Sequence, residues 1–270
     1  MNKIAEISSA NPSLIGLILD TSHSTSQTFG LNTTKTINDV ILNSADKVVC
    51  DFLHQSATND AGVKDYFDVL AVGFGREASS LLPDEEILKP ISFFEHNYLR
   101  EVPVEDPEDA FLAGSTSNVK WFDKKPSGGT NMAAAFEMIE PHIRDWCLNN
   151  PYSVPPAMFL LTDGAFTGDD PTDAINRVLS LGTEHGSTRL FVGHVSTLGN
   201  EPIVFPSAAD VLPDDFARWL YNIASPMPLW MQEIAAKEAD LVVNEGRKGF
   251  CFNANLEALA TFMDIGTRPA

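Results

Sequence analysis

The chain has 270 residues, of which 44% are hydrophobic, enough to form a full core in one large domain or in one domain with an appendage. Its 18 basic and 37 acidic residues give a formal charge of −19. A charge of this size and sign would repel nucleic-acid phosphates and anionic lipid surfaces, so we expect neither a nucleic-acid partner nor a membrane partner.

The first predicted element is a buried strand that ends in a polar loop. Residues 14–19 are a short apolar run, and Asp20 follows directly. In an extended loop, Asp20, Ser22 and Ser24 would face the same side, so that one carboxylate and two hydroxyls converge. Oxygen ligands of this kind suit a hard cation, although Asp and Ser are also ordinary turn and helix-capping residues.

Further helices and strands are predicted along the chain. The clearest helix spans residues 34–57, where apolar residues recur with a period of 3.6 and neither Gly nor Pro occurs. Residues 66–74 predict the next strand. Residues 95–125 show no sustained periodicity and are typical of a loop or insertion near the rim of a site. A second long helix is predicted at 131–148, where Pro141 would kink or split it.

Two later segments carry the same kind of chemistry. Residues 127–132 read S-G-G-T-N-M, in which two glycines let the backbone approach a site just before Thr130. Residues 157–162 predict another buried strand, and Asp163 follows it. In a parallel sheet with helices on both faces, ligands bind outside the carboxyl ends of the strands. All three polar segments would meet there.

These three motifs resemble the metal-ion-dependent adhesion site of the von Willebrand factor A (vWA) family, which combines D-x-S-x-S, a Thr in a second loop and an Asp in a third. The matching residues are Asp20, Ser22, Ser24, Thr130 and Asp163. The G-G-T-N and T-D-G motifs are similar to those of the bacterial and intracellular branch. The resemblance covers residues 13–225 and implies a Rossmann-like, doubly wound α/β fold whose mostly parallel central sheet has helices on both faces.

The resemblance also implies a mechanism. Ser22 and Ser24 would ligate Mg²⁺, Mn²⁺ or Ca²⁺ directly, and the Thr and the two Asp would ligate it directly or through water. An open coordination position would then accept an Asp or Glu of a protein partner. Intracellular members often act as scaffolds or adaptors beside ring ATPases, kinases or phosphatases. We therefore expect a bacterial-type binding protein that is not an enzyme.

Two other functions remain open. A Mg²⁺-dependent phosphohydrolase on a related doubly wound sheet would use Asp20 as its nucleophile. Such enzymes usually need a second Asp two residues later, where this chain has Ser22. The other alternative is an adhesion module that acts outside the cell.

Cysteine usage and the lack of targeting signals favour the cytoplasm. The three cysteines are far apart and have no C-x-x-C spacing, which argues against a disulfide framework or a zinc site. Residues 1–12, which we interpret as a leader, lack the apolar core of a secretory signal, and no apolar stretch is long enough to span a bilayer.

The C-terminal part of the chain allows two arrangements. In the preferred one, the core ends with a short strand at 203–205 and a helix at 214–223, and residues 226–270 form a helical extension. The alternative places the last core strand at 250–252 and the last core helix at 256–265.

Overall fold

The computed structural model describes residues 6–30, 34–58, 62–103, 117–164, 166–197, 202–238 and 246–267. Its centre is an eight-stranded sheet in the order β13-β14-β12-β9-β1-β4-β5, in which β6 also pairs with β4. The strands are β1 (Ser13–Asp20), β4 (Phe67–Phe74), β5 (Ala78–Ser80), β6 (Leu88–Pro90), β9 (Ala157–Thr162), β12 (Arg189–His194), β13 (Ile203–Val204) and β14 (Phe250–Phe252).

The sheet is mostly parallel. β1 pairs in parallel with both β4 and β9, β9 pairs in parallel with β12, and β12 with β14. Only the short strands at the two edges, β5, β6 and β13, are antiparallel. This topology confirms the predicted α/β fold.

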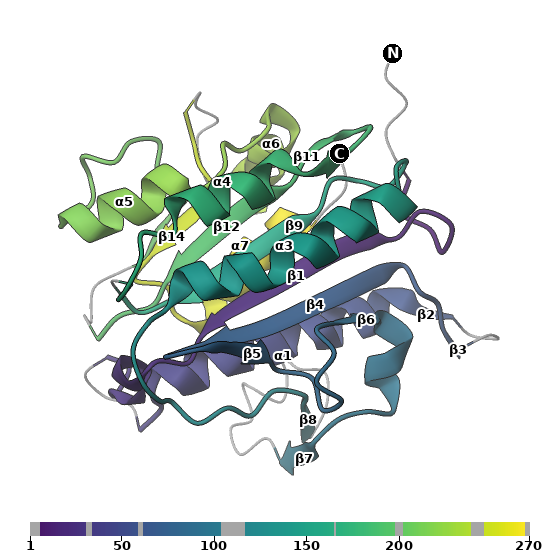
Figure 1. The fold of residues 1–270 in the computed structure, drawn as a ribbon, viewed down its shortest axis with the longest axis horizontal. Coiled ribbons are helices and arrows are strands. Elements are labelled where there is room, and N and C mark those ends of the chain that lie inside the picture. The colour runs from purple at the N-terminus through teal and green to yellow at the C-terminus, as the bar shows by residue number, and fades with distance from the viewer. Residues whose placement is uncertain are drawn as a thin grey trace.

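Helices cover both faces of the sheet (Figure 1). One face packs against α3 (Met132–Asn149), α4 (Thr172–Ser180) and α5 (Asp215–Ile223). The other packs against α1 (Ile37–Ser56), α6 (Leu229–Glu238) and α7 (Leu256–Thr267). Because both faces are covered, all eight residues of β1 are buried, which explains why its sequence is a continuous apolar run.

Among the residues that the structure describes, the smaller elements are two 3₁₀ turns and three hairpins. The turns are η1 (His23–Ser26) and η2 (Ile91–Glu95). The hairpins are formed by β2 (Ala57–Thr58) with β3 (Gly62–Val63), β7 (Arg100–Pro103) with β8 (Ser117–Lys120), and β10 (Gly182–Thr183) with β11 (Gly186–Ser187). None of the helices in the described part of the chain is both long enough and apolar enough to cross a membrane.

Two local expectations differ from the structure. Pro141 does not split the second long helix, since α3 is continuous from Met132 to Asn149. The segment expected as a loop near the site rim contains β7 and β8, which form a hairpin beside the middle of α1, away from the carboxyl ends of the parallel strands (Figure 1). Residues 104–116 of that segment lie outside the described residues.

The C-terminal segment belongs to the central sheet. β14 lies between β13 and β12, and α7 covers the same face as α1. β14 and α7 thus occupy the positions of the last core strand and helix in the alternative arrangement, and β13 and α5 match the strand and helix of the preferred one. All three residues of β14 are buried, but a strand this short gives no periodic signal in the sequence.

Truncating Phe262 of α7 should destabilise the whole domain. Its side chain is fully buried, with its ring centroid 5.2 Å from that of Phe205 and 5.8 Å from that of Phe191. We expect Phe262→Ala to lower the free energy of unfolding by about 3 to 5 kcal/mol in a denaturant titration. Leu148→Ala, at a side chain that is 73% exposed, is the matched control. Equal stabilities for the two variants would contradict the assignment of α7 to the core.

Candidate metal centre

The five predicted site residues meet at the carboxyl edge of the sheet. Asp20 is the last residue of β1, and Asp163 follows β9. Because β1 and β9 are parallel neighbours, the two carboxylates end at the same edge. Thr130 lies just before α3, whose N-cap is the next residue, Asn131. The structure thus brings together three segments that are far apart in the sequence.

The D-x-S-x-S segment is a turn and not the extended loop that we expected. Ser22 is extended, but residues from His23 onward form η1. Both the hydroxyl and the amide of Thr25 donate to the Ser22 carbonyl, at 2.8 and 3.2 Å. This Thr-stabilised turn brings Ser24 back toward Ser22, so the two hydroxyls still converge.

The side-chain oxygens form a continuous chain. Ser22 Oγ lies 2.9 Å from Ser24 Oγ, and Ser24 Oγ donates to Asp163 Oδ1 at 3.0 Å. Adjacent ligands of an octahedral Mg²⁺, each at about 2.1 Å from the ion, are themselves about 3.0 Å apart. The spacing of these oxygens therefore fits neighbouring positions around such a cation.

Asp20 lies beneath this chain of oxygens. Its side chain is fully buried, with Oδ1 accepting the Ser22 amide at 2.9 Å and Oδ2 accepting the Thr162 hydroxyl at 2.6 Å. A cavity of about 430 Å³ is lined by the other four candidate ligands. The described lining residues are Ser22, Ser24, Gln27, Ile37, Gly128, Gly129, Thr130, Asp163, Gly164, Thr167, Ser196 and Thr197. Asp20 is not among them. Its contribution to the site is to hold the Ser22 amide and the Thr162 hydroxyl in place.

The Thr130 loop is held by hydrogen bonds of its backbone on both sides. The Thr130 amide donates to Thr167 Oγ1 and the Thr167 amide donates to the Thr130 carbonyl, both at 2.8 Å. On the other side, the Ser127 amide donates to the Thr21 carbonyl at 2.9 Å. Gly128 has a φ of +72°, and a Cβ there would lie 2.5 Å from Arg76 Cβ. The glycine therefore permits a close approach to Arg76, which differs from the predicted approach to the site.

Both carboxyl groups have raised pKa values. Burial raises the pKa of Asp20 above its ordinary value, although hydrogen bonds from Thr162 and Ser22 oppose the shift. Burial, together with the nearby Asp20 charge, raises the pKa of Asp163 to about 6. Two carboxylates this close and this buried repel each other when both are ionised. A divalent cation would relieve that repulsion.

The donor set fits a hard cation. All five candidate ligands offer oxygen, two as carboxylates and three as hydroxyls, which suits Mg²⁺, Mn²⁺ or Ca²⁺ better than Zn²⁺ or Cu²⁺. Within the described part of the chain, no group of three or more His, Cys, Asp or Glu side chains is placed to hold a metal ion. A cation here would therefore depend on the hydroxyls as much as on the carboxylates.

Two residues that position the site were not singled out from the sequence. Thr162 fixes the Asp20 carboxylate, and Thr167 fixes the Thr130 backbone. Both lie within four residues of Asp163, so their proximity to the third motif was the available signal. Their hydrogen-bond partners lie 142 and 37 residues away in the sequence, so no local sequence pattern indicates these contacts.

No protein-family model matches the sequence, and no curated protein matches it. Among solved structures, the chain is similar to the manganese-loaded TRAP protein of Plasmodium vivax, with a TM-score of 0.47 and 11% identity, covering 97% of this chain and 75% of that one. It is also similar to the vWF domain of the type V pili tip protein Mfa5 from Porphyromonas gingivalis, with a TM-score of 0.32 and 16% identity, covering 58% of this chain and 39% of that one.

A third similar structure is proximal thread matrix protein 1 of the mussel byssus, with a TM-score of 0.42 and 13% identity, covering 80% of this chain and 42% of that one. The chain spans less than half the length of the Mfa5 and mussel structures. The structural neighbours thus include vWA-domain proteins. Since all three TM-scores lie below 0.5, a function for this chain has to rest on its own residues.

Removing the charge of Asp20 should lower the pKa of Asp163. We expect Asp20→Asn to bring the Asp163 pKa below its wild-type value of about 6, while burial still holds it above the ordinary range. Carboxyl ¹³C NMR titration of the metal-free protein measures this shift. Asp51→Asn, on the exposed side of α1, should leave the Asp163 pKa unchanged. An Asp163 pKa insensitive to Asp20→Asn would show that the two carboxylates do not interact.

Proposed function

We propose that this chain is a divalent-cation-dependent protein-binding module. The observation that carries the proposal is the chain of oxygens from Ser22 through Ser24 to Asp163, spaced at 2.9 and 3.0 Å on the wall of an open cavity. In this proposal, Mg²⁺ or Mn²⁺ binds these residues together with Thr130, and Asp20, which does not line the cavity, contributes to the site through water. A carboxylate of a partner protein then completes the coordination.

The charge around the cavity supports a bridging role for the cation. No Lys or Arg is among the described lining residues, and the chain as a whole carries a formal charge of −19. An acidic side chain would therefore be repelled from the metal-free cavity. Bound metal supplies the local positive charge that such a side chain needs, so recognition should depend strictly on the cation.

The burial of Asp20 supports a binding role over phosphoryl transfer. A phosphohydrolase nucleophile has to reach the phosphorus atom, but both Asp20 oxygens accept hydrogen bonds and the side chain is fully buried. Ser22, at the position where an acid-base carboxylate is expected, offers only a hydroxyl. We therefore propose that the protein is not an enzyme.

The proposed setting is a scaffold or adaptor in a bacterial, cytoplasmic multi-protein system, beside a ring ATPase, kinase or phosphatase. The thiols support a reducing compartment, since Cys50, Cys147 and Cys251 are all free. Burial raises the pKa of the Cys147 thiol to about 11, which makes it unreactive. An extracellular adhesion module remains the alternative, and it would use the same cavity.

Titration calorimetry tests the metal site. We expect one Mn²⁺ or Mg²⁺ per chain at pH 7, and we expect binding to be lost in Asp20→Ala and Ser22→Ala. Because the pKa of Asp163 is about 6, protons should compete with the cation below that pH and weaken binding up to about tenfold per pH unit.

Ser26→Ala is the control, since Ser26 lies in the same turn but its hydroxyl donates to the His23 carbonyl. Unchanged isotherms for both Asp20→Ala and Ser22→Ala would overturn the site assignment. Turnover of an aryl phosphate that disappears in Asp20→Asn would instead favour the phosphohydrolase.

Chelation should separate binding from folding. The core consists of strands such as β1 and β9 and not of metal ligands, so EDTA should cost at most about 1 to 3 kcal/mol of stability relative to millimolar Mg²⁺. We expect an unchanged circular dichroism spectrum and the loss of partners captured from lysate. Global unfolding in EDTA would make the cation structural, and an identical set of partners would place recognition elsewhere on the surface.

A further inference from the structure

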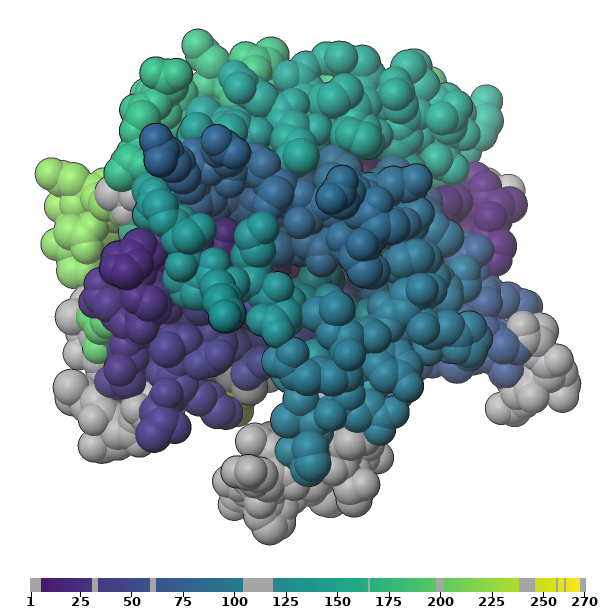
Figure 2. Space-filling model, turned by 60° about the horizontal axis from the view of Figure 1, so that its bottom comes forward, coloured from purple at the N-terminus to yellow at the C-terminus, as the bar shows by residue number. Residues whose placement is uncertain are grey.

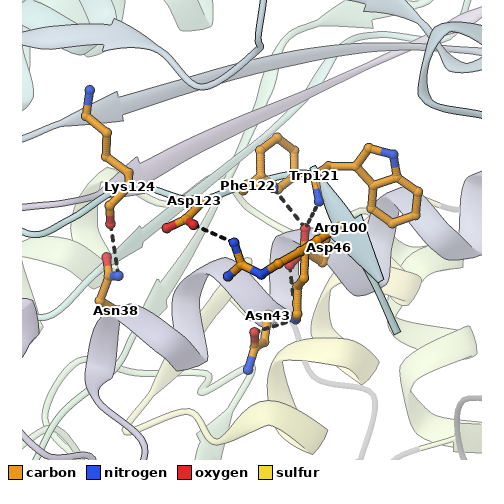
Figure 3. Close-up of polar contacts among 9 residues, drawn as sticks. Asn38, Asn43, Asp46, Arg100, Trp121, Phe122, Asp123 and Lys124 are labelled. Atoms are coloured by element: carbon orange, nitrogen blue, oxygen red, sulfur yellow. Dashed lines mark hydrogen bonds and ion pairs between the residues drawn. The ribbon is translucent and has the colours of Figure 1, made fainter. Parts of the chain in front are cut away.

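Asp46 is a buried carboxylate in the middle of α1, and it is not one of the candidate metal ligands. Only 3% of the residue is exposed, and its Oδ1 accepts two consecutive backbone amides, those of Trp121 at 2.8 Å and Phe122 at 3.1 Å (Figure 3). Lys120 Nζ lies 3.2 Å from Oδ2 and also donates to Asn43 Oδ1 at 2.6 Å. The carboxylate thus fastens one point of a distant segment to α1.

That segment is the one that leads to Thr130. Residues 121–130 form neither helix nor strand, so no backbone ladder fixes their course. In Figure 2 these residues, in teal, cross the surface beside the purple N-terminal residues. We call residues 121–129 the strap. Its path depends on contacts at its two ends and on a few along its length.

The contacts at the metal end are backbone hydrogen bonds to the site itself. The Ser127 amide donates to the Thr21 carbonyl, and the His23 amide donates to the Gly128 carbonyl at 3.2 Å. Along the strap, Asn38 of α1 donates to the Lys124 carbonyl at 3.1 Å (Figure 3). At the other end, the buried side chains of Trp121 and Phe122 pack in the same core cluster as α1. Asp46 fixes the backbone at that end.

Stability alone does not account for a carboxylate at this place. Burial raises the pKa of Asp46 to about 6, although the charge of Lys120 opposes the shift. Because this pKa lies above the ordinary value of 3.8, the group contributes stability in acid that is lost as the pH rises through about 6. The ionised side chain is therefore unfavourable for folding at neutral pH, and what it provides is two strong, charge-assisted hydrogen bonds in a defined position.

We propose that Asp46 is a positioning residue for the metal site: by holding the Trp121 and Phe122 amides, it fixes the strap and thereby the place of Thr130. The part of this inference that concerns cation binding rests on the proposed function. The part that concerns the strap does not depend on any metal. Groups that orient metal ligands from outside typically change the affinity by about ten- to a hundredfold when removed.

The test compares Asp46→Ala with Asp51→Ala. Asp51 lies on the same helix and forms an i,i+4 ion pair with Lys47 at 2.6 Å, and its side chain is 40% exposed. It is therefore an aspartate of the same helix that does not contact the strap. Amide hydrogen exchange of the metal-free proteins measures how firmly the strap is held. We expect the amides of Trp121 and Phe122 to exchange at least about tenfold faster in Asp46→Ala, because their acceptor is gone, and the amides of residues 127–129 to exchange faster as well, because the strap loses its anchor. All of these amides should be unchanged in Asp51→Ala.

Calorimetric titration of the same proteins with Mn²⁺ measures the affinity of the metal site. We expect Asp46→Ala to bind Mn²⁺ at least about tenfold more weakly than Asp51→Ala. Unchanged exchange at residues 127–129, or equal Mn²⁺ affinities in the two variants, would overturn the proposal. If the wild-type protein binds no Mn²⁺, the proposed function fails, while the exchange data still decide whether Asp46 holds the strap.

A second variant covers the case in which Asp46→Ala does not fold. Asp46→Asn keeps one oxygen acceptor but removes its charge and turns an amide toward the Lys120 ammonium. We expect faster exchange at residues 121–129 than in Asp51→Asn and an Mn²⁺ affinity that is several-fold weaker. Behaviour identical to that of Asp51→Asn in both measurements would overturn the proposal.

Discussion

The buried carboxylate of Asp20 is the constraint on which the rest of the site depends. An ionised group without exposure needs hydrogen bonds, and Asp20 receives them from the Ser22 amide and the Thr162 hydroxyl. These two contacts join the loop after β1 to the end of β9. The raised pKa of Asp20 indicates that they do not fully offset burial. A cation in the cavity above would supply the remaining stabilisation, so the fold and the proposed function share one interaction.

The central part of the fold and the convergence of the candidate site residues at one edge of the sheet could be predicted because their signals are local. A parallel strand buried on both faces is a continuous apolar run, as in β1 and β9, and the polar residue at its end marks the edge of the sheet. The polar residues after these two strands and Thr130 in the loop before α3, in the expected order, also carry the resemblance to the vWA family. The structure brings Ser22, Ser24, Thr130 and Asp163 around one cavity.

The features that the sequence did not reveal depend on contacts between distant segments. β14 has three residues and looks like any short apolar stretch, yet it completes the sheet beside β12. Thr162 and Thr167 are common residues whose partners lie far away in the sequence. Asp46 lies within a helix whose pattern is otherwise amphipathic, and only the path of the strap shows why it is buried. In each case the role of the residue can be seen only when the position of its distant partner in the fold is known.

Anomalous diffraction from crystals of the protein grown with Mn²⁺ tests the central claim most directly. The account predicts one strong anomalous peak in the cavity, within bonding distance of Ser22 Oγ and Ser24 Oγ, with Asp20 still bound to the Ser22 amide and the Thr162 hydroxyl. A peak bound to other residues, or none at millimolar Mn²⁺, would contradict it.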